Sequence, residues 1–155
     1  MGEAGVSESA RATTAQEAAF RVPYANSTPR RARLVALDQA SEGLVRHLAR
    51  GGAGRSALSL WSERDAAEAR ALVDSLAPTD LVVLVSTGGA DSPAAQLIAE
   101  ACRLRRVPVL VFVLDTPARA GELPQILGHL RPYASMLVRA ADAAYVADML
   151  TALRA

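Results

Sequence analysis

The sequence contains no lysine, because all 17 residues counted as lysine or arginine are arginine. A chain without a side-chain primary amine has no P-loop lysine, no Schiff base with pyridoxal phosphate or a carbonyl substrate, and no lysine general base. Arginine does not take over these roles, since its guanidinium stays protonated and is not a nucleophile. The sequence therefore excludes these enzyme classes before any fold is considered.

Cysteine, histidine and aromatic residues are also scarce. Cys102 is the only cysteine, which rules out an internal disulfide, and its place in an apolar helical stripe predicts a buried thiol. The two histidines, His47 and His129, fall within predicted helices, so neither a zinc site nor a Ser/His/Asp triad is indicated. No Gly-x-Ser-x-Gly motif is present either. We therefore predict no catalytic residues and no metal site, and the sequence names no cofactor.

Charge and hydrophobic runs are limited as well. A formal net charge of +1 gives no electrostatic footprint for nucleic acid. The longest strongly apolar run, Val107 to Leu114, is far too short to span a bilayer, and the first residues do not resemble a signal peptide. We expect a soluble, cytoplasmic protein that binds neither nucleic acid nor a membrane.

Residues 1–29 differ in composition from the rest of the chain. They are rich in Ala, Ser, Thr and Glu, and Thr14 to Glu17 fits a helix capping box. Phe20 and Tyr24 are two of only six aromatic residues in the chain. The segment is either a docking arm, with Phe20 and Tyr24 as candidate contacts to a partner or another subunit, or a tail outside the domain formed by residues 30–155.

From residue 30 onward, apolar runs of strand length alternate with helical periodicity. The predicted strands are Arg33–Leu37, Ala57–Trp61, Leu81–Val85, Val107–Leu114 and Ser135–Val138. The third and fourth show no polar alternation, which is typical of strands buried on both faces. Predicted helices follow each strand, with Leu97 among the residues expected to be buried. Five βα units predict a single doubly wound parallel five-stranded sheet of α/β class, Rossmann-like or flavodoxin-like, with an N-terminal extension.

Ligands of such sheets bind beyond the carboxyl ends of the strands. The candidate ligand-binding residues at these ends are Asp38, Ser86, Thr87, Gly88, Gly89, Asp91, Asp115 and Arg139. The loop Ser86 to Asp91 leads from a buried strand to a helix start, and its two glycines suit either a phosphate-binding loop or a tight turn. Asp91 disfavours phosphate because it already lies at the positive helix end. Asp38, Asp91 and Asp115 suit Mg²⁺ if they converge, but each is equally explained by turn formation.

The segment from Asp80 to Leu114 resembles part of the nucleotide-binding domain of the FtsZ/tubulin GTPases. In that family a strand leads into a glycine-rich phosphate loop, an Ala-rich helix start and a second buried strand. Gly88 and Gly89 match the glycines of that loop, whereas residues 90–92 (Ala-Asp-Ser) stand where the family has further Gly and Thr. The resemblance implies a nucleotide-binding loop and does not extend to GTP hydrolysis.

Residues 32–154 resemble a degenerate response-regulator receiver (CheY-like) domain in length and strand spacing. The family carries a phosphoacceptor Asp at the end of its third strand, where this chain has Val85 and Ser86, and a Lys after the fifth, where Arg139 stands. The resemblance implies a pseudo-receiver that is not phosphorylated in the usual way.

These observations lead to two functional expectations. The first is a non-catalytic α/β module, an accessory or structural subunit that binds a protein partner, forms a homo-oligomer or takes a small ligand. The alternative is a nucleotide- or small-molecule-binding enzyme subunit that uses the Ser-Thr-Gly-Gly loop at residues 86–89 for an anionic ligand.

Overall fold

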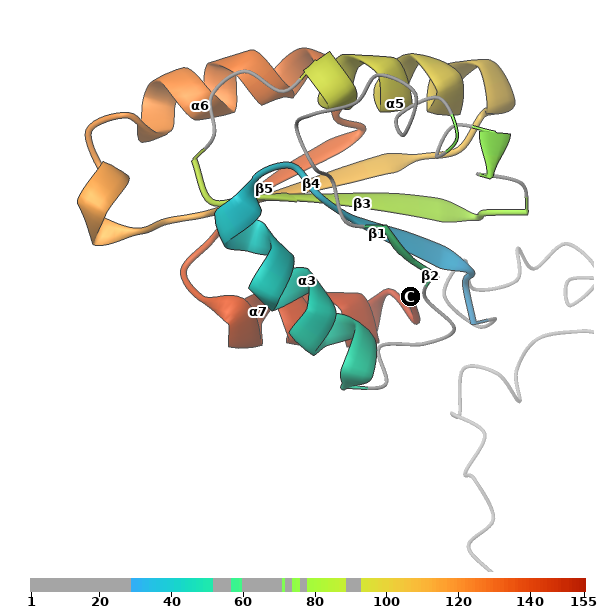
Figure 1. Cartoon of the computed structure of the whole chain (residues 1–155), viewed down its shortest axis with the longest axis horizontal. Helices are drawn as coiled ribbons and strands as arrows, with labels where there is room; N and C mark the ends of the chain where they lie inside the picture. The colour runs from blue at the N-terminus through green and yellow to red at the C-terminus, as the bar shows by residue number, and fades with distance from the viewer. Residues whose placement is uncertain (1–28, 52–56, 60–70, 72–73, 76–77, 89–92) are drawn as a thin grey trace, which may run out of the picture.

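A parallel β-sheet with helices on both faces forms the body of the molecule (Figure 1). The computed structural model describes residues 29–51, 57–59, 71, 74–75, 78–88 and 93–155. The predicted α/β class, a parallel sheet with flanking helices, is confirmed. No helix within these ranges has the length and apolar character needed to cross a bilayer.

The sheet has the strand order β2-β1-β3-β4-β5, and all neighbouring strands are parallel. This is the flavodoxin-like order, in which the chain reverses direction of travel across the sheet next to β1 and β3. Four strands are five or six residues long: β1 (Ala32–Ala36), β3 (Leu81–Ser86), β4 (Val109–Leu114) and β5 (Met136–Ala140). The edge strand β2 (Ala57–Ser59) has only three residues, shorter than the predicted run to Trp61, and residues 60 and 61 lie outside the described ranges.

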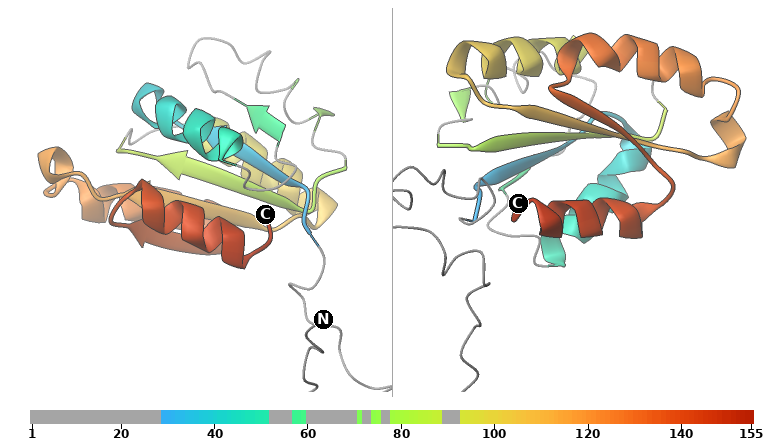
Figure 2. Two further views of the ribbon diagram at one scale, coloured as in Figure 1. Left: turned by 90° about the horizontal axis from the view of Figure 1, so that it is seen from below. Right: turned by 180° about the vertical axis from the view of Figure 1, so that it is seen from behind.

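Helices lie on both faces of the sheet (Figure 2). The face with α5 (Pro93–Arg105) and α6 (Leu123–Leu130) lies opposite the face with α3 (Gln39–Arg50) and α7 (Ala143–Ala152). Two short 3-10 helices, η1 (Pro117–Arg119) and η2 (Arg131–Tyr133), flank α6. Right-handed crossovers between parallel strands produce this placement.

The core lies on both sides of β3 and β4, as the unbroken Val and Leu runs predict. Every residue of β3 is buried, as are the first five of β4. Alternate residues point to two apolar clusters, one beneath α5 and α6 and one beneath α3 and α7. Each buried Leu or Val side chain contributes about 1.5–3 kcal/mol relative to exposure.

Helix α5 corrects one prediction and confirms another. Leu97 was expected in the core but is 46% exposed. Successive helix residues differ in direction by about 100°, so Ile98, which points at the sheet, leaves Leu97 on the flank. Cys102 is fully buried as predicted, and burial raises the pKa of its thiol to about 11 against an opposing effect of Arg105. Such a thiol is inert at neutral pH.

Candidate functional site

The candidate site lies where β1 and β3 end side by side. The two strands pair in register from Ala32 with Leu81 to Ala36 with Val85. The residues that follow them, Asp38 after β1 and Thr87 after β3, therefore meet at the carboxyl edge of the sheet. This adjacency of central strands is the position at which open α/β sheets bind ligands.

Asp38 joins the two strand ends through its carboxylate. The Oδ1 atom accepts hydrogen bonds from the Ser41 amide and the Thr87 hydroxyl, both at 2.7 Å. The Oδ2 atom accepts from the Thr87 amide at 2.7 Å and from the Ser86 hydroxyl at 3.1 Å. A carboxylate offers about four acceptor positions. All of them are occupied here by groups of the protein itself.

Asp38 also begins helix α3. It is the N-cap residue, and with Ser41 it forms a reciprocal capping box. The Ser41 hydroxyl accepts from the Asp38 amide at 3.3 Å and donates to the Asp38 carbonyl at 2.9 Å. Because Asp38 is only 9% exposed and Ser41 is fully buried, this network is almost completely removed from water.

The charge state of Asp38 follows from two opposing effects. Burial on its own raises the pKa of the carboxyl group, because the charged form loses its hydration. The hydrogen bonds from Thr87, Ser41 and Ser86 outweigh this and hold the pKa below its ordinary value. Asp38 is therefore an anion at neutral pH whose charge is compensated entirely by dipoles.

Ser86 and Gly88 shape the loop after β3. Ser86 is fully buried, and its hydroxyl accepts a hydrogen bond from the Gly88 amide at 3.2 Å while donating to Asp38. Gly88 has φ +122, a conformation that L side chains rarely adopt. A Cβ atom at this position would lie 2.7 Å from Cδ of Arg119. The glycine is thus required by its backbone angle and by a neighbour from another loop.

The side chain of Arg119, in η1 after β4, lies against this loop. Its guanidinium donates to the Gly88 carbonyl and lies 4.0 Å from the carboxylate of Glu122. The side chain is half exposed. Sequence inspection missed Arg119, since nothing in the run after β4 distinguishes it from a surface arginine 31 positions away in the chain.

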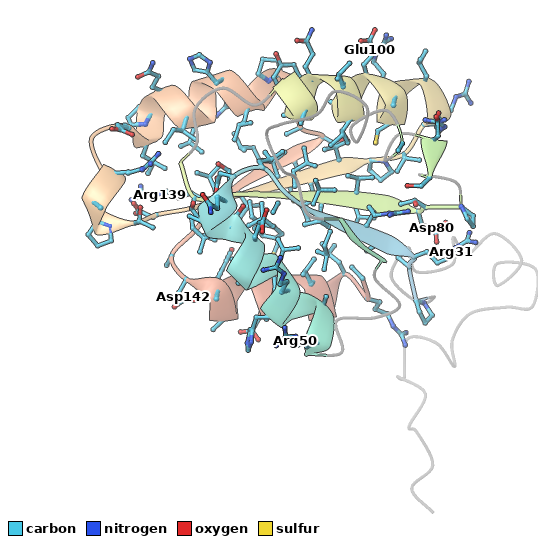
Figure 3. The ribbon with its side chains drawn as sticks, viewed as in Figure 1. Arg31, Arg50, Asp80, Glu100, Arg139 and Asp142 are labelled. Carbon is cyan, nitrogen blue, oxygen red and sulfur yellow. The ribbon has the colours of Figure 1, made fainter. Side chains whose placement is uncertain are left out.

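Arg139 and Asp115 form a second polar group at the same edge. The Arg139 guanidinium donates through Nε, at 2.9 Å, and through Nη2 to Oδ2 of Asp115. The Arg139 side chain is 59% exposed and that of Asp115 is 25% exposed. Figure 3 shows Arg139 and Asp142 at the end of the molecule opposite Arg31 and Asp80. Within the described ranges, no hydrogen bond or ion pair joins this pair to Asp38.

The structure therefore places some predicted site residues together and leaves others apart. Asp38, Ser86, Thr87 and Gly88 form one network, whereas Asp115 and Arg139 form another. Gly89, Asp91, Phe20 and Tyr24 lie outside the described residues. Of the three aspartates considered for Mg²⁺, Asp38 has no acceptor position left. Among the residues that the structure describes, no group of three His, Cys, Asp or Glu side chains is arranged to hold a metal.

Sequence comparison gives no assignment, because no protein-family model and no curated protein matches the chain. Solved structures do match. A fusion protein that contains the yeast Spc42 trimeric coiled coil is 15% identical, with 82% of this chain and 80% of that chain covered and a TM-score of 0.50. At this identity the match concerns the fold alone.

Two further matches have lower TM-scores. The signal receiver domain of NarL from Mycobacterium tuberculosis is 18% identical over 82% of this chain and 98% of that one, with a TM-score of 0.47. A protein from Burkholderia pseudomallei whose name relates it to pilus assembly is 22% identical over 81% and 90%, also at 0.47. The FtsZ/tubulin resemblance is not supported. The receiver-like layout is carried by the strand order of this chain itself, which receiver domains share.

Proposed function

We propose that this chain is a non-catalytic α/β module that acts by binding a protein partner, a second copy of itself included, and that it works in the cytoplasm. The observation that carries the proposal is the saturation of Asp38 by four internal hydrogen bonds. An edge whose central carboxylate, hydroxyls and amides already satisfy one another offers little to a cation or a phosphate.

The positions that a receiver domain uses for phosphorylation support this proposal. A phosphoacceptor must be reachable by its donor, whereas Ser86, at the corresponding strand end, is fully buried and bonded on both sides. Mg²⁺ requires free oxygen ligands, and Asp38 has none. Arg139, in place of the lysine, pairs with Asp115. In this proposal the hydrogen bonds at the carboxyl edge hold the ends of β1 and β3 together, and the edge does not change conformation in response to phosphorylation.

The alternative function, binding of a nucleotide or another small anion, has one observation in its favour. The guanidiniums of Arg119 and Arg139 lie at the carboxyl edge and are half or more exposed. Against it, the amides of Thr87 and Gly88, which a phosphate loop would offer to its ligand, already donate to Asp38 and Ser86. We therefore place this function second.

Thermal unfolding with added ligands separates the two functions. The full chain is heated with Mg²⁺, with acetyl phosphate plus Mg²⁺, and with purine nucleotides with and without Mg²⁺. We expect an unchanged Tm and no added phosphoryl mass. A rise in Tm with a nucleotide that Arg119→Gln abolishes and Arg46→Gln preserves would overturn the proposal and establish the alternative, since Arg46 lies on α3 and pairs there with Glu42.

Association is tested on the exposed leucines of α5. Leu97 is 46% and Leu104 is 74% exposed, and residues seven positions apart lie on one helix face. If a second copy is the partner, light scattering should show a molar mass that rises with concentration and falls in the Leu97→Gln/Leu104→Gln variant. Tyr145→Gln, a replacement at an equally exposed site on α7, serves as the control. A monomer at every concentration would exclude the second copy.

A further inference from the structure

An open groove of about 660 Å³ lies at the amino ends of the strands, the end of the sheet opposite Asp38. Its floor contains Val107, Val109 and Ala134, which pack onto the core beneath α5 and α6. Tyr133 and the exposed Pro132 form one side. The combination of an apolar floor, an aromatic ring and prolines suits an extended segment that carries aromatic side chains.

The rim of the groove is basic. Arg103 and Arg106 line it, with Glu100 as the acidic exception. Neither guanidinium group has a hydrogen bond or ion pair among the residues that the structure describes, so both are available to an acidic side chain.

Arg106 stands in a position that favours glycine. It follows the last turn of α5 with φ 57, in the left-handed region, and its amide donates to the Arg103 carbonyl at 3.2 Å. Helices commonly end with glycine in this conformation because other L residues are strained there. This conformation ends α5 with the Arg106 side chain on the rim of the groove.

The chain that precedes β1 starts within reach of this groove. Arg33, Val82 and Val109 are neighbours across three paired strands, so the groove floor lies two strand spacings, about 10 Å, from β1. Arg30 is fixed at the same end of the sheet, but on the face of α7 opposite the groove, because its amide donates to the Arg154 carbonyl at 2.7 Å. Phe20 and Arg30 are ten positions apart, and an extended chain covers up to about 33 Å over ten steps. The chain between Arg30 and Phe20 is therefore long enough to pass around the sheet and bring Phe20 to the groove.

We propose that the groove between α5 and η2 is the docking site of the chain's own N-terminal segment, with Phe20 and Tyr24 on its apolar floor. Residues 1–28 contain three glutamates and two arginines, an excess of one negative side-chain charge. Glu17, three residues before Phe20, is the natural partner of Arg103 or Arg106. A tether this short gives an effective concentration in the millimolar range, which favours the chain's own segment over that of another copy. The inference is independent of the function proposed for the Asp38 edge.

A spin label on the N-terminal segment tests the proposal in the full chain. Ala25→Cys carries the nitroxide, and Cys102→Ala removes the only other thiol. We expect the amide signals of Val107, Ala134 and Ser135 to lose intensity in a nitrogen-15 chain that carries the label. Unchanged intensities at these amides would overturn the proposal.

Two pairs of variants separate docking from mere tethering. Phe20→Ala/Tyr24→Ala keeps the label and the tether but removes both rings, and the groove amides should recover their intensity. Arg106→Gly should relieve backbone strain and raise the Tm while weakening docking. Arg105→Gln, a replacement of the neighbouring exposed arginine that does not line the groove, should leave docking unchanged. Broadening that persists after removal of the rings would contradict the proposal.

A mixed sample identifies the source of the docked segment. Spin-labelled chains of natural isotope abundance are mixed with unlabelled nitrogen-15 chains. We expect no broadening in the mixture, because each groove holds its own segment. Broadening there would assign the groove to the segment of a second copy and overturn docking within one chain.

Discussion

Asp38 has two structural roles at the carboxyl edge of the sheet. As an N-cap it accepts from the Ser41 amide, and as a joint it accepts three hydrogen bonds from Ser86 and Thr87 at the end of β3. Hydrogen bonds to a buried charged group are stronger than those between neutral groups. A single side chain therefore adds three hydrogen bonds to the backbone pairing of the two strand ends, which continues to the bond from the Leu37 amide to the Val85 carbonyl.

Replacement of Asp38 should be unusually costly for an N-cap. Asp38→Ala leaves the Thr87 amide without its acceptor and the Ser41 amide with only the Asp38 carbonyl at 3.2 Å, and we expect a loss of about 3 kcal/mol in the free energy of unfolding. Asp142→Ala is the matched control, because Asp142 caps α7 by accepting from the Tyr145 amide at an exposed site. It should cost about 1 kcal/mol. Equal losses in urea unfolding would show that the links to Thr87 and Ser86 contribute nothing.

Gly88 should not tolerate a side chain. Gly88→Ala meets both an unfavourable φ and Cδ of Arg119 at 2.7 Å, and we expect a destabilisation of about 1–3 kcal/mol by urea unfolding. Gly43→Ala should change the free energy of unfolding in the opposite direction, because a Cβ added at this position of α3 meets no neighbouring atom within 4 Å. Alanine there should stabilise by about 0.5–1 kcal/mol. A neutral Gly88→Ala variant would mean that the loop relaxes freely.

At the scale of elements, the start of α3 is fixed by its capping box. The Ser41 hydroxyl and the Asp38 carboxylate satisfy each other's backbone groups inside the protein. The helix direction is thereby set against the end of β3, since the same carboxylate holds Thr87. Helix α3 and strand β3 should behave as one unit.

Ser41→Ala should loosen this unit. The Asp38 amide loses its buried acceptor, and we expect a cost of about 1–2 kcal/mol together with faster hydrogen exchange in the first turn of α3. Thr151→Ala is the control, since its hydroxyl donates to the Ala147 carbonyl at an exposed site within α7. That change should have almost no effect. Unaltered exchange at α3 would contradict the role given to the capping box.

For the molecule as a whole, the lowered pKa of Asp38 couples stability to pH. The folded state holds this carboxyl below its ordinary pKa through the bonds from Thr87, Ser41 and Ser86, which outweigh burial. The stabilisation is complete above the unfolded-state value of about 3.9 and is lost as the pH falls through the lower folded value. Lowering the pH through this range should therefore reduce the free energy of unfolding.

Urea unfolding as a function of pH measures this coupling. We expect the free energy of unfolding to fall between about pH 5 and pH 3, and to fall less steeply in Asp38→Asn. Asp80→Asn serves as a comparison, because hydrogen bonds from Arg31 also lower the pKa of Asp80 but at an exposed site. Its effect on the slope should be smaller. If the free energy of unfolding depended on pH in the same way in the natural chain and in Asp38→Asn, Asp38 would not be the group that couples stability to pH.

Much of the fold was predictable because it follows from local patterns. Unbroken runs of Val and Leu predicted β3 and β4 as strands buried on both faces. The predicted burial of Leu97 was wrong, because helical periodicity locates the apolar stripe of a helix but not the width of that stripe. The candidate site was predictable only as a set of strand ends. Neither the three bonds that Asp38 accepts from Ser86 and Thr87 nor the approach of Arg119 to Gly88 leaves a signal in the sequence, since each joins residues more than 30 positions apart.

The sequence by itself determined the class of the fold and several exclusions. Apolar periodicity requires helices on both faces of a parallel sheet, and the absence of lysine removes amine chemistry whatever the arrangement of the chain. Tertiary structure alone decided what the polar residues at the strand ends do. The order β2-β1-β3 brings Asp38 beside Ser86 and Thr87, where a carboxylate removed from water takes the nearest donors. The same pairing of strands brings the groove within reach of the N-terminal segment.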